Sequence, residues 1–128
     1  MPENFMLDPA NILIIEEHPA LRAALRDWLA FSFPDYQVNT SENYIDALNR
    51  IRGNFPEIVV VDFDMIGKNG LCAIERIKTY APLCKIVILT LLADESNRSI
   101  FETAGVDARV LKQSLGTNLI PTMTALLE

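Results

Sequence analysis

Three short runs of the chain are almost entirely apolar, and each one ends at or beside a polar residue. They read NILII at 11–15, EIVVVDF at 57–63 and KIVILT at 85–90. Their apolar residues are continuous rather than alternating, which is typical of strands covered on both faces of a parallel sheet. Two weaker runs, YQVNT at 36–40 and ARVLK at 108–112, complete a set of five predicted strands.

Apolar residues recur at helical spacing in the segment that follows each predicted strand. Helices are therefore expected at 19–31, 41–51, 71–80, 94–105 and 117–128. Pro19 suits a first helical turn, Ser41 is expected to cap the second helix, and Gly105 is expected to end the fourth. Pro121 is expected near the first turn of the last helix, where its missing N–H costs little.

A strand followed by a helix, five times over, predicts an α/β fold. Such βα units imply right-handed crossovers and a doubly wound, five-stranded parallel sheet. Residues 1–10 are predicted to form an N-terminal tail and residues 11–128 a single domain, because no linker or repeat interrupts the pattern. In such sheets ligands bind beyond the carboxyl ends of the strands.

Charge and composition argue against several classes of function. The 128 residues carry a formal charge of −6, whereas contacts to nucleic-acid phosphates need clustered Lys and Arg. We therefore expect no direct binding of nucleic acid by this chain. No apolar run approaches the roughly 20 residues of a membrane span, and the first residues lack the basic start of a signal peptide. A cytoplasmic protein without membrane contact is expected.

The cysteines and the histidine do not form a zinc site, and nothing in the sequence supports a nucleophilic pair of Cys72 and His18. Cys72, Cys84 and His18 are too few for a zinc site, which needs about four N or S ligands. A disulfide is not expected in the cytoplasm. Both cysteines are expected to be buried in the core, since a free Cys behaves as a small apolar residue.

Polar residues stand at the carboxyl ends of four predicted strands, which a parallel sheet brings to one edge. They are Glu16 and Glu17, Asp62, Thr90 and Lys112. Carboxylates on neighbouring strands, about 4.8 Å apart, repel one another when no cation is bound. A hard divalent cation, which prefers oxygen ligands, would relieve that repulsion. Taken singly, each of these residues also fits an ordinary solvated surface.

Four segments carry a family resemblance: ILIIEEHPALRAAL, PEIVVVDFDMIGKNGLCAIERIK, KIVILT and AGVDARVLK. Together they resemble the receiver domain of response regulators in two-component signalling, over essentially the whole chain. The EHP after the first strand is most similar to receivers of helix-turn-helix regulators, which implies a link to transcription regulation. The resemblance also implies a flavodoxin-like sheet with the strand order 2-1-3-4-5.

The resemblance assigns a role to each residue at the strand ends. Asp62 would accept a phosphoryl group from a histidine kinase or a phosphotransfer protein, so the chain would be a switch rather than an enzyme. The implied Mg²⁺ ligands are Glu16, Glu17, Asp62 and the backbone carbonyl of Asp64. The residues implied to contact the phosphoryl group or to switch with it are Thr90, Lys112 and Arg109.

Several residues depart from the receiver pattern. Glu17 stands where the family has Asp, and its extra methylene conflicts with the strict octahedral geometry of Mg²⁺. Other departures are Ile66 for a proline, Leu91 for a small residue and Arg109 for an aromatic. Asp64 and Leu92 stand where the family tunes dephosphorylation. The departures favour, as an alternative, an atypical receiver that acts by protein binding with weak or no phosphorylation.

The resemblance implies an interaction surface, and a homodimer interface, formed by the segments 94–105, 108–112 and 117–128. Its candidate residues are Arg98, Phe101, Arg109 and Met123. An unpaired buried guanidinium is very costly. Arg109 is therefore expected to lie at the surface and to pair with an acid.

A second resemblance leads to a different class of protein. VVVDFD is also similar to the first motif of haloacid dehalogenase-like phosphatases, in which Asp62 would be the nucleophile and Asp64 the general acid. That motif normally lies on the first core strand and has a pair of acids after the lysine. Here an acid-tipped strand precedes the motif and no acidic pair follows Lys112, so this alternative is remote.

Overall fold

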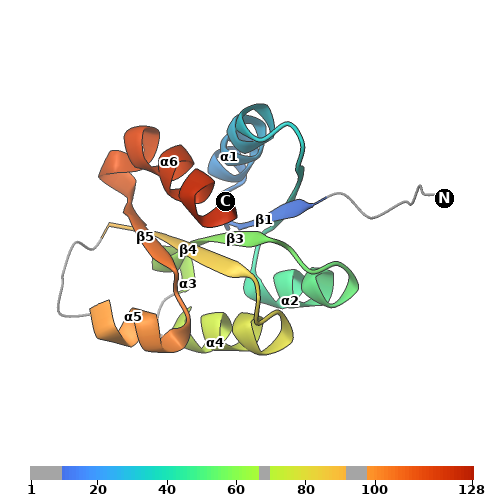
Figure 1. Cartoon of the computed structure of the whole chain (residues 1–128), viewed down its shortest axis with the longest axis vertical. Helices are drawn as coiled ribbons and strands as arrows, with labels where there is room; N and C mark the ends of the chain where they lie inside the picture. The colour runs from blue at the N-terminus through green and yellow to red at the C-terminus, as the bar shows by residue number, and fades with distance from the viewer. Residues whose placement is uncertain (1–9, 67–69, 92–97) are drawn as a thin grey trace.

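The computed structural model describes residues 10–66, 70–91 and 98–128, and a five-stranded parallel sheet runs through its centre (Figure 1). The strands are β1 (Asn11–Ile15), β2 (Gln37–Ser41), β3 (Ile58–Asp62), β4 (Lys85–Thr90) and β5 (Ala108–Leu111). They lie in the order β2-β1-β3-β4-β5. This confirms the doubly wound, flavodoxin-like fold and the strand order that the resemblance implies.

Helices cover both faces of the sheet. They are α1 (Pro19–Ser32), α2 (Tyr44–Gly53), α3 (Phe63–Ile66), α4 (Gly70–Tyr80), α5 (Arg98–Ala104) and α6 (Leu115–Leu127). Helices α1 and α6 lie on one face, and α2, α4 and α5 lie on the other (Figure 1). The short α3, which follows β3 directly, has no counterpart among the helices predicted from the sequence.

Each central strand contributes to two separate hydrophobic cores, because successive side chains point to opposite faces of the sheet. The core beneath α2, α4 and α5 contains Leu13, Val59, Val61, Ile86 and Ile88. The core beneath α1 and α6 contains Ile12, Ile14, Val60, Val87 and Leu89. Burial on both faces explains the unbroken apolar runs in the sequence.

Two local predictions about helix ends are wrong. Ser41 is the last residue of β2, and Asn43 instead caps α2 by accepting the Asp46 N–H at 2.8 Å. Helix α6 begins at Leu115, so Pro121 lies inside it rather than in its first turn. The helix starts early because the 3₁₀ turn Lys112–Ser114 leads into it without an intervening loop.

The expectation of two buried cysteines holds for Cys84 but is wrong for Cys72. Helix α4 turns Ala73, Ile74 and Ile77 toward the sheet, which leaves Cys72 on the solvent side. Burial raises the pKa of the Cys84 thiol to about 12. Cys84 is therefore a neutral core residue at physiological pH.

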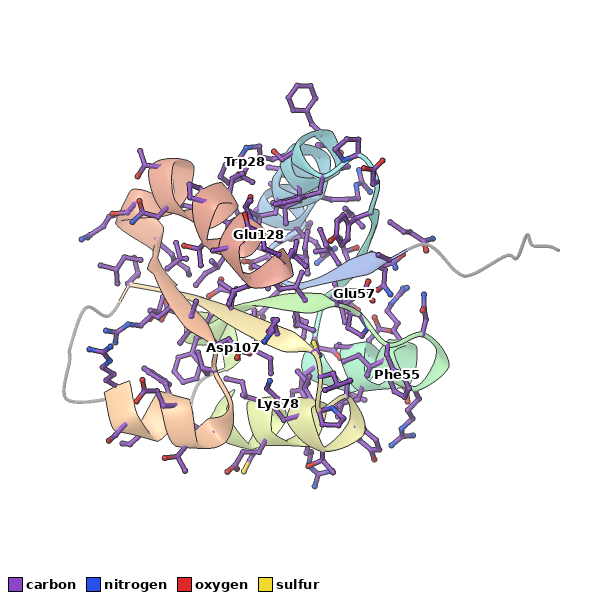
Figure 2. All side chains as sticks on the ribbon, viewed as in Figure 1. Trp28, Phe55, Glu57, Lys78, Asp107 and Glu128 are labelled. Carbon is purple, nitrogen blue, oxygen red and sulfur yellow. The ribbon has the colours of Figure 1, made fainter. Side chains whose placement is uncertain are left out.

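An ion pair joins α4 to the residue just before β5, at the amino-terminal edge of the sheet, where Figure 2 labels Lys78 and Asp107. Lys78 Nζ lies 3.2 Å from Asp107 Oδ2 and donates a hydrogen bond to the Cys84 carbonyl at 2.6 Å. Asp107 Oδ2 also accepts the Ile86 N–H at 2.8 Å. Gly105 packs against the stem of Lys78 and has a φ of +104°.

Gly105→Ala is expected to destabilise the fold by about 1–3 kcal/mol. The new Cβ would lie 2.6 Å from Lys78 Cγ, and the positive φ disfavours any L side chain. Urea denaturation measures the loss. Gly53→Ala is the control, because nothing lies within 4 Å of its added Cβ and its φ is not positive. Equal stability of the two variants would contradict the role given to Gly105.

Candidate functional site

The strand order brings polar side chains from four strands to the carboxyl edge of the sheet. Glu16 follows β1, Asp62 ends β3, Thr90 ends β4, and Lys112 follows β5. Because β3 lies between β1 and β4, Asp62 takes the central place among them. The side chains of Glu16, Asp62 and Thr90 are buried, with exposed fractions of 2%, 6% and 0%.

Lys112 pairs with two carboxylates at once. Its Nζ lies 2.9 Å from Asp62 Oδ1 and 3.1 Å from Asp64 Oδ2. Burial lowers the pKa of Lys112, but the hydrogen bonds and charges of the two aspartates outweigh burial and raise the pKa above its usual value. Lys112 is therefore a fixed cation at neutral pH, directed at Asp62.

Asp64 enters the site from α3, through the turn that follows β3. Its backbone N–H donates to Asp62 Oδ1 at 3.1 Å. Its carboxylate accepts the Thr90 hydroxyl at Oδ1 and the Leu91 N–H at Oδ2, both at 2.9 Å. Burial raises the pKa of Asp64, but the bonds from Lys112, Thr90 and Leu91 outweigh it and hold the pKa below its usual value.

Glu16 is a buried acid of the cluster whose carboxylate is only partly hydrogen-bonded. Its Oε2 accepts the His18 N–H at 3.0 Å, whereas its buried Oε1 has no hydrogen-bond partner. Burial, followed by the side chain of Asp62, raises the pKa of Glu16 from 4.5 to about 7. A buried carboxylate oxygen without a donor is a costly arrangement that a bound cation would relieve.

The structure does not bring Glu17 into this cluster. The Glu17 side chain is exposed, and the Glu17 backbone carbonyl accepts a hydrogen bond from Arg22 Nη1 at 3.1 Å. Among the described residues, no three His, Cys, Asp or Glu side chains are arranged to hold a metal ion. Glu16, through its unpartnered Oε1, and Asp62 offer the oxygen atoms that a hard cation prefers, and the assignment of Glu17 as a ligand stays a prediction.

Among the remaining predicted positions, the structure describes Leu91 and Arg109. Leu91 is 67% exposed beside the site. Leu92 lies outside the described residues, and so do the side-chain positions of Ile66. Arg109 is half-buried, with its guanidinium carbon 5.9 Å from the centre of the Phe101 ring. Its pairing with an acid stays a prediction.

Two of the four residues predicted for the interaction surface are core residues. Phe101 packs edge-to-face on Phe63, with ring centroids 5.0 Å apart, and Met123 is a fully buried residue of α6. Both apolar side chains face the sheet because that is the buried stripe of their helices. Arg98 is exposed on α5 and remains a candidate for the surface.

The sheet order and the strand-end cluster define a receiver-like α/β domain, and comparison with known proteins gives the family. Residues 12–123 match the response regulator receiver domain. The chain belongs to this family. This membership removes the haloacid dehalogenase-like alternative, which would place VVVDFD on the first strand.

Curated relatives are response regulators that extend beyond this domain. The chain is 30% identical over 120 residues to response regulator MprA of Mycobacterium sp. (strain KMS), which covers 94% of the chain and 51% of the relative. It is 24% identical over 105 residues to the nitrate/nitrite response regulator protein NarL of Escherichia coli (strain K12), covering 82% and 49%. The chain thus spans about half the length of these relatives.

Solved structures agree on the fold. A two-component response regulator of the LuxR family from Aurantimonas sp. SI85-9A1 superposes with a TM-score of 0.82 at 26% identity, covering 94% of this chain and 86% of that one. The chemotaxis protein CheY4 of Vibrio cholerae has a TM-score of 0.75 at 16% identity, covering 94% and 97%. Within residues 10–66, 70–91 and 98–128, no helix is long and apolar enough to cross a membrane.

Proposed function

We propose that this receiver domain is a phosphoacceptor switch, in which Asp62 takes a phosphoryl group from the phosphohistidine of a histidine kinase or a phosphotransfer protein. The observation that carries the proposal is the placement of Asp62, buried at the central strand end and 2.9 Å from the cation of Lys112. A nucleophilic carboxylate beside a fixed cation suits the transfer of an anionic group.

The chemistry follows from the groups present. A carboxylate oxygen of Asp62 attacks phosphorus, an O–P bond forms, and the P–N bond of the donor breaks with its electron pair leaving on the imidazole. Lys112 offsets the negative charge that develops on the phosphoryl oxygens. The Thr90 hydroxyl and the Leu91 N–H, which bond the carboxylate of Asp64 at 2.9 Å, would be donors for the product.

The residues that would hold Mg²⁺ are Glu16 through its unpartnered Oε1, Asp62, and the backbone carbonyl of Asp64. Bound there, the ion would supply positive charge to the phosphoryl oxygens. Glu17, as it lies here, would contribute only by turning its exposed side chain inward.

The partners follow from the same switch. The chain would meet its phosphodonor in the cytoplasm and would signal through the surface of α5, β5 and α6, to an output domain, another protein or a second copy. A hollow of about 340 Å³ lies on this surface, lined by Arg98, Glu102, Arg109 and neighbours. A role in transcription regulation is proposed here only by analogy, because solved structures similar to this chain include DNA-binding response regulators.

Incubation with a small phosphodonor and Mg²⁺ is expected to add one phosphoryl group, at Asp62. Intact-mass spectrometry measures the adduct, and peptide mapping places it. Asp62→Asn is expected to abolish it, and Asp27→Asn, an exposed acid on α1, to leave it unchanged. An adduct that survives Asp62→Asn would identify a different acceptor. The absence of any adduct would favour the alternative below.

A second candidate function has its own support. An atypical receiver that binds its partner with weak or no phosphorylation would fit the exposed side chain of Glu17 and the large Leu91 beside the acceptor. It would also fit the hydrogen bonds that already tie Thr90 and Leu91 to Asp64.

A further inference from the structure

The carboxylate of Asp64 gathers donors from two neighbouring strand ends. Thr90 Oγ1 lies 2.9 Å from its Oδ1, and the Leu91 nitrogen 2.9 Å from its Oδ2. Lys112 Nζ lies 3.1 Å from the same Oδ2. A carboxylate has room for about four such bonds, so Asp64 is close to saturation.

These donors are the groups that a phosphoryl group on Asp62 would need. Asp62 and Asp64 are held together, because the Asp64 N–H donates to Asp62 Oδ1 at 3.1 Å and Lys112 pairs with both carboxylates. A hydroxyl, a backbone N–H and an ammonium group converging on one anion make a ready-made oxyanion site. In this chain a side chain already fills that site.

We propose that Asp64 is an internal stand-in for the phosphoryl group: its carboxylate occupies the Thr90, Leu91 and Lys112 donors until an incoming phosphoryl group displaces it. This deepens the proposed function and rests on it. Asp64 then has two effects. It holds Thr90 and Leu91 in a phosphoryl-bound-like position without phosphorylation, and it opposes phosphorylation by occupancy and by like charge.

The position of Asp64 in α3, directly after β3, explains why its carboxylate reaches Thr90 and Leu91 as well as Lys112. The turn α3 directly after β3 carries Asp64 back over the strand end, toward β4. An ion pair with Lys112 alone would leave Thr90 and Leu91 to bond elsewhere. Instead, the neutral hydroxyl and the backbone N–H both point at the same carboxylate, as they would at a bound anion.

The test is binding of beryllium fluoride, a tetrahedral phosphoryl analogue, to the full chain in the presence of Mg²⁺. Asp64→Ala removes the stand-in, and Asp27→Ala removes one exposed carboxylate from α1 as a control. The amide NMR signals of Thr90 and Leu91 measure the affinity for beryllium fluoride, and in the unliganded protein they report the backbone position of these two residues. Asp64→Ala is expected to bind at least about tenfold more tightly than wild type and Asp27→Ala equally to wild type.

The free-state spectra give a second readout that does not depend on the analogue. Loss of the stand-in is expected to shift the Leu91 amide of unliganded Asp64→Ala, and beryllium fluoride is expected to move it back toward the wild-type position. Asp64→Asn, of the same shape but uncharged, is expected to lie between the two.

The outcomes distinguish failure of the stand-in alone from failure of the proposed function. Equal affinity of wild type and Asp64→Ala, with Asp62 phosphorylated normally in both, would overturn the stand-in and leave the proposed function intact. Failure of every folded variant to bind the analogue or to accept a phosphoryl group would overturn both. If Asp64→Ala does not fold, Asp64→Asn takes its place in the test. An affinity of Asp64→Asn for beryllium fluoride equal to that of wild type would then overturn the stand-in.

Discussion

Lys112→Met is expected to destabilise the protein by about 3 kcal/mol at neutral pH and to abolish stable phosphorylation of Asp62. The variant keeps an apolar side chain of similar length but leaves the carboxylates of Asp62 and Asp64 without the ammonium that pairs with both. Asp62 is 6% exposed, so water replaces that partner poorly. Chemical denaturation in metal-free buffer measures the cost.

The cost of Lys112→Met is expected to shrink at about pH 5, where proton uptake by Glu16 removes part of the like-charge repulsion. Lys78→Met is the matched control. Lys78 is exposed to the same extent as Lys112, 23%, and also pairs with an aspartate, but it lies at the opposite edge of the sheet. A loss of about 1 kcal/mol with normal phosphorylation is expected for it. A similar loss of phosphorylation in both variants would contradict a specific role for Lys112.

Glu16→Gln is expected to stabilise the metal-free protein by about 2–3 kcal/mol at about pH 8 and to have little effect below about pH 5. Burial and the neighbouring Asp62 raise the pKa of Glu16 from 4.5 to about 7. The unfolded chain therefore loses the Glu16 proton at a lower pH than the folded chain does. Between these two values, the free energy of unfolding falls as the pH rises.

The glutamine amide keeps the shape and removes the buried charge, so this pH-dependent loss of stability disappears. Thermal or urea unfolding across this pH range measures it. Glu17→Gln is the matched control, an identical change at the next residue, whose side chain is exposed. Stabilisation by both variants to the same extent would show a general effect of net charge rather than strain at Glu16. Destabilisation by Glu16→Gln at about pH 8 would contradict the cluster itself.

The fold could be predicted from the sequence because two patterns are strong. The apolar runs at 11–15, 57–63 and 85–90 are short and continuous, which is typical of strands buried on both faces, and the helical spacing between them predicts the alternation of strands and helices. Element ends were less predictable. Asn43 rather than Ser41 caps α2 because β2 extends through Ser41, which pairs with Ile15 of β1. Such pairing joins residues distant in sequence, so a local sequence pattern does not predict where the strand ends.

Part of the site could also be predicted, since Glu16, Asp62, Thr90 and Lys112 all stand at strand ends that topology brings together. The carboxylate of Asp64 could not be assigned this way. Its contacts with Thr90 and Leu91 depend on α3, a single turn of four residues without a helical repeat in the sequence. Burial of Phe101 and exposure of Cys72 likewise depend on how α5 and α4 are rotated against the sheet.

The bridge from Lys112 to Asp62 also ties the site to the order in which the chain becomes structured. Strand β5 has four residues and pairs with β4 alone, so its place at the edge of the sheet depends on β4. Until it docks, the strand ends of β1 and β3 present acids without their cation. Short, peripheral elements of this kind open more readily than the central strands do. Asp62 would then accept a phosphoryl group only when all five strands are in place. Local opening of β5 would remove Lys112 from the site and stop phosphorylation, while the rest of the domain stays folded.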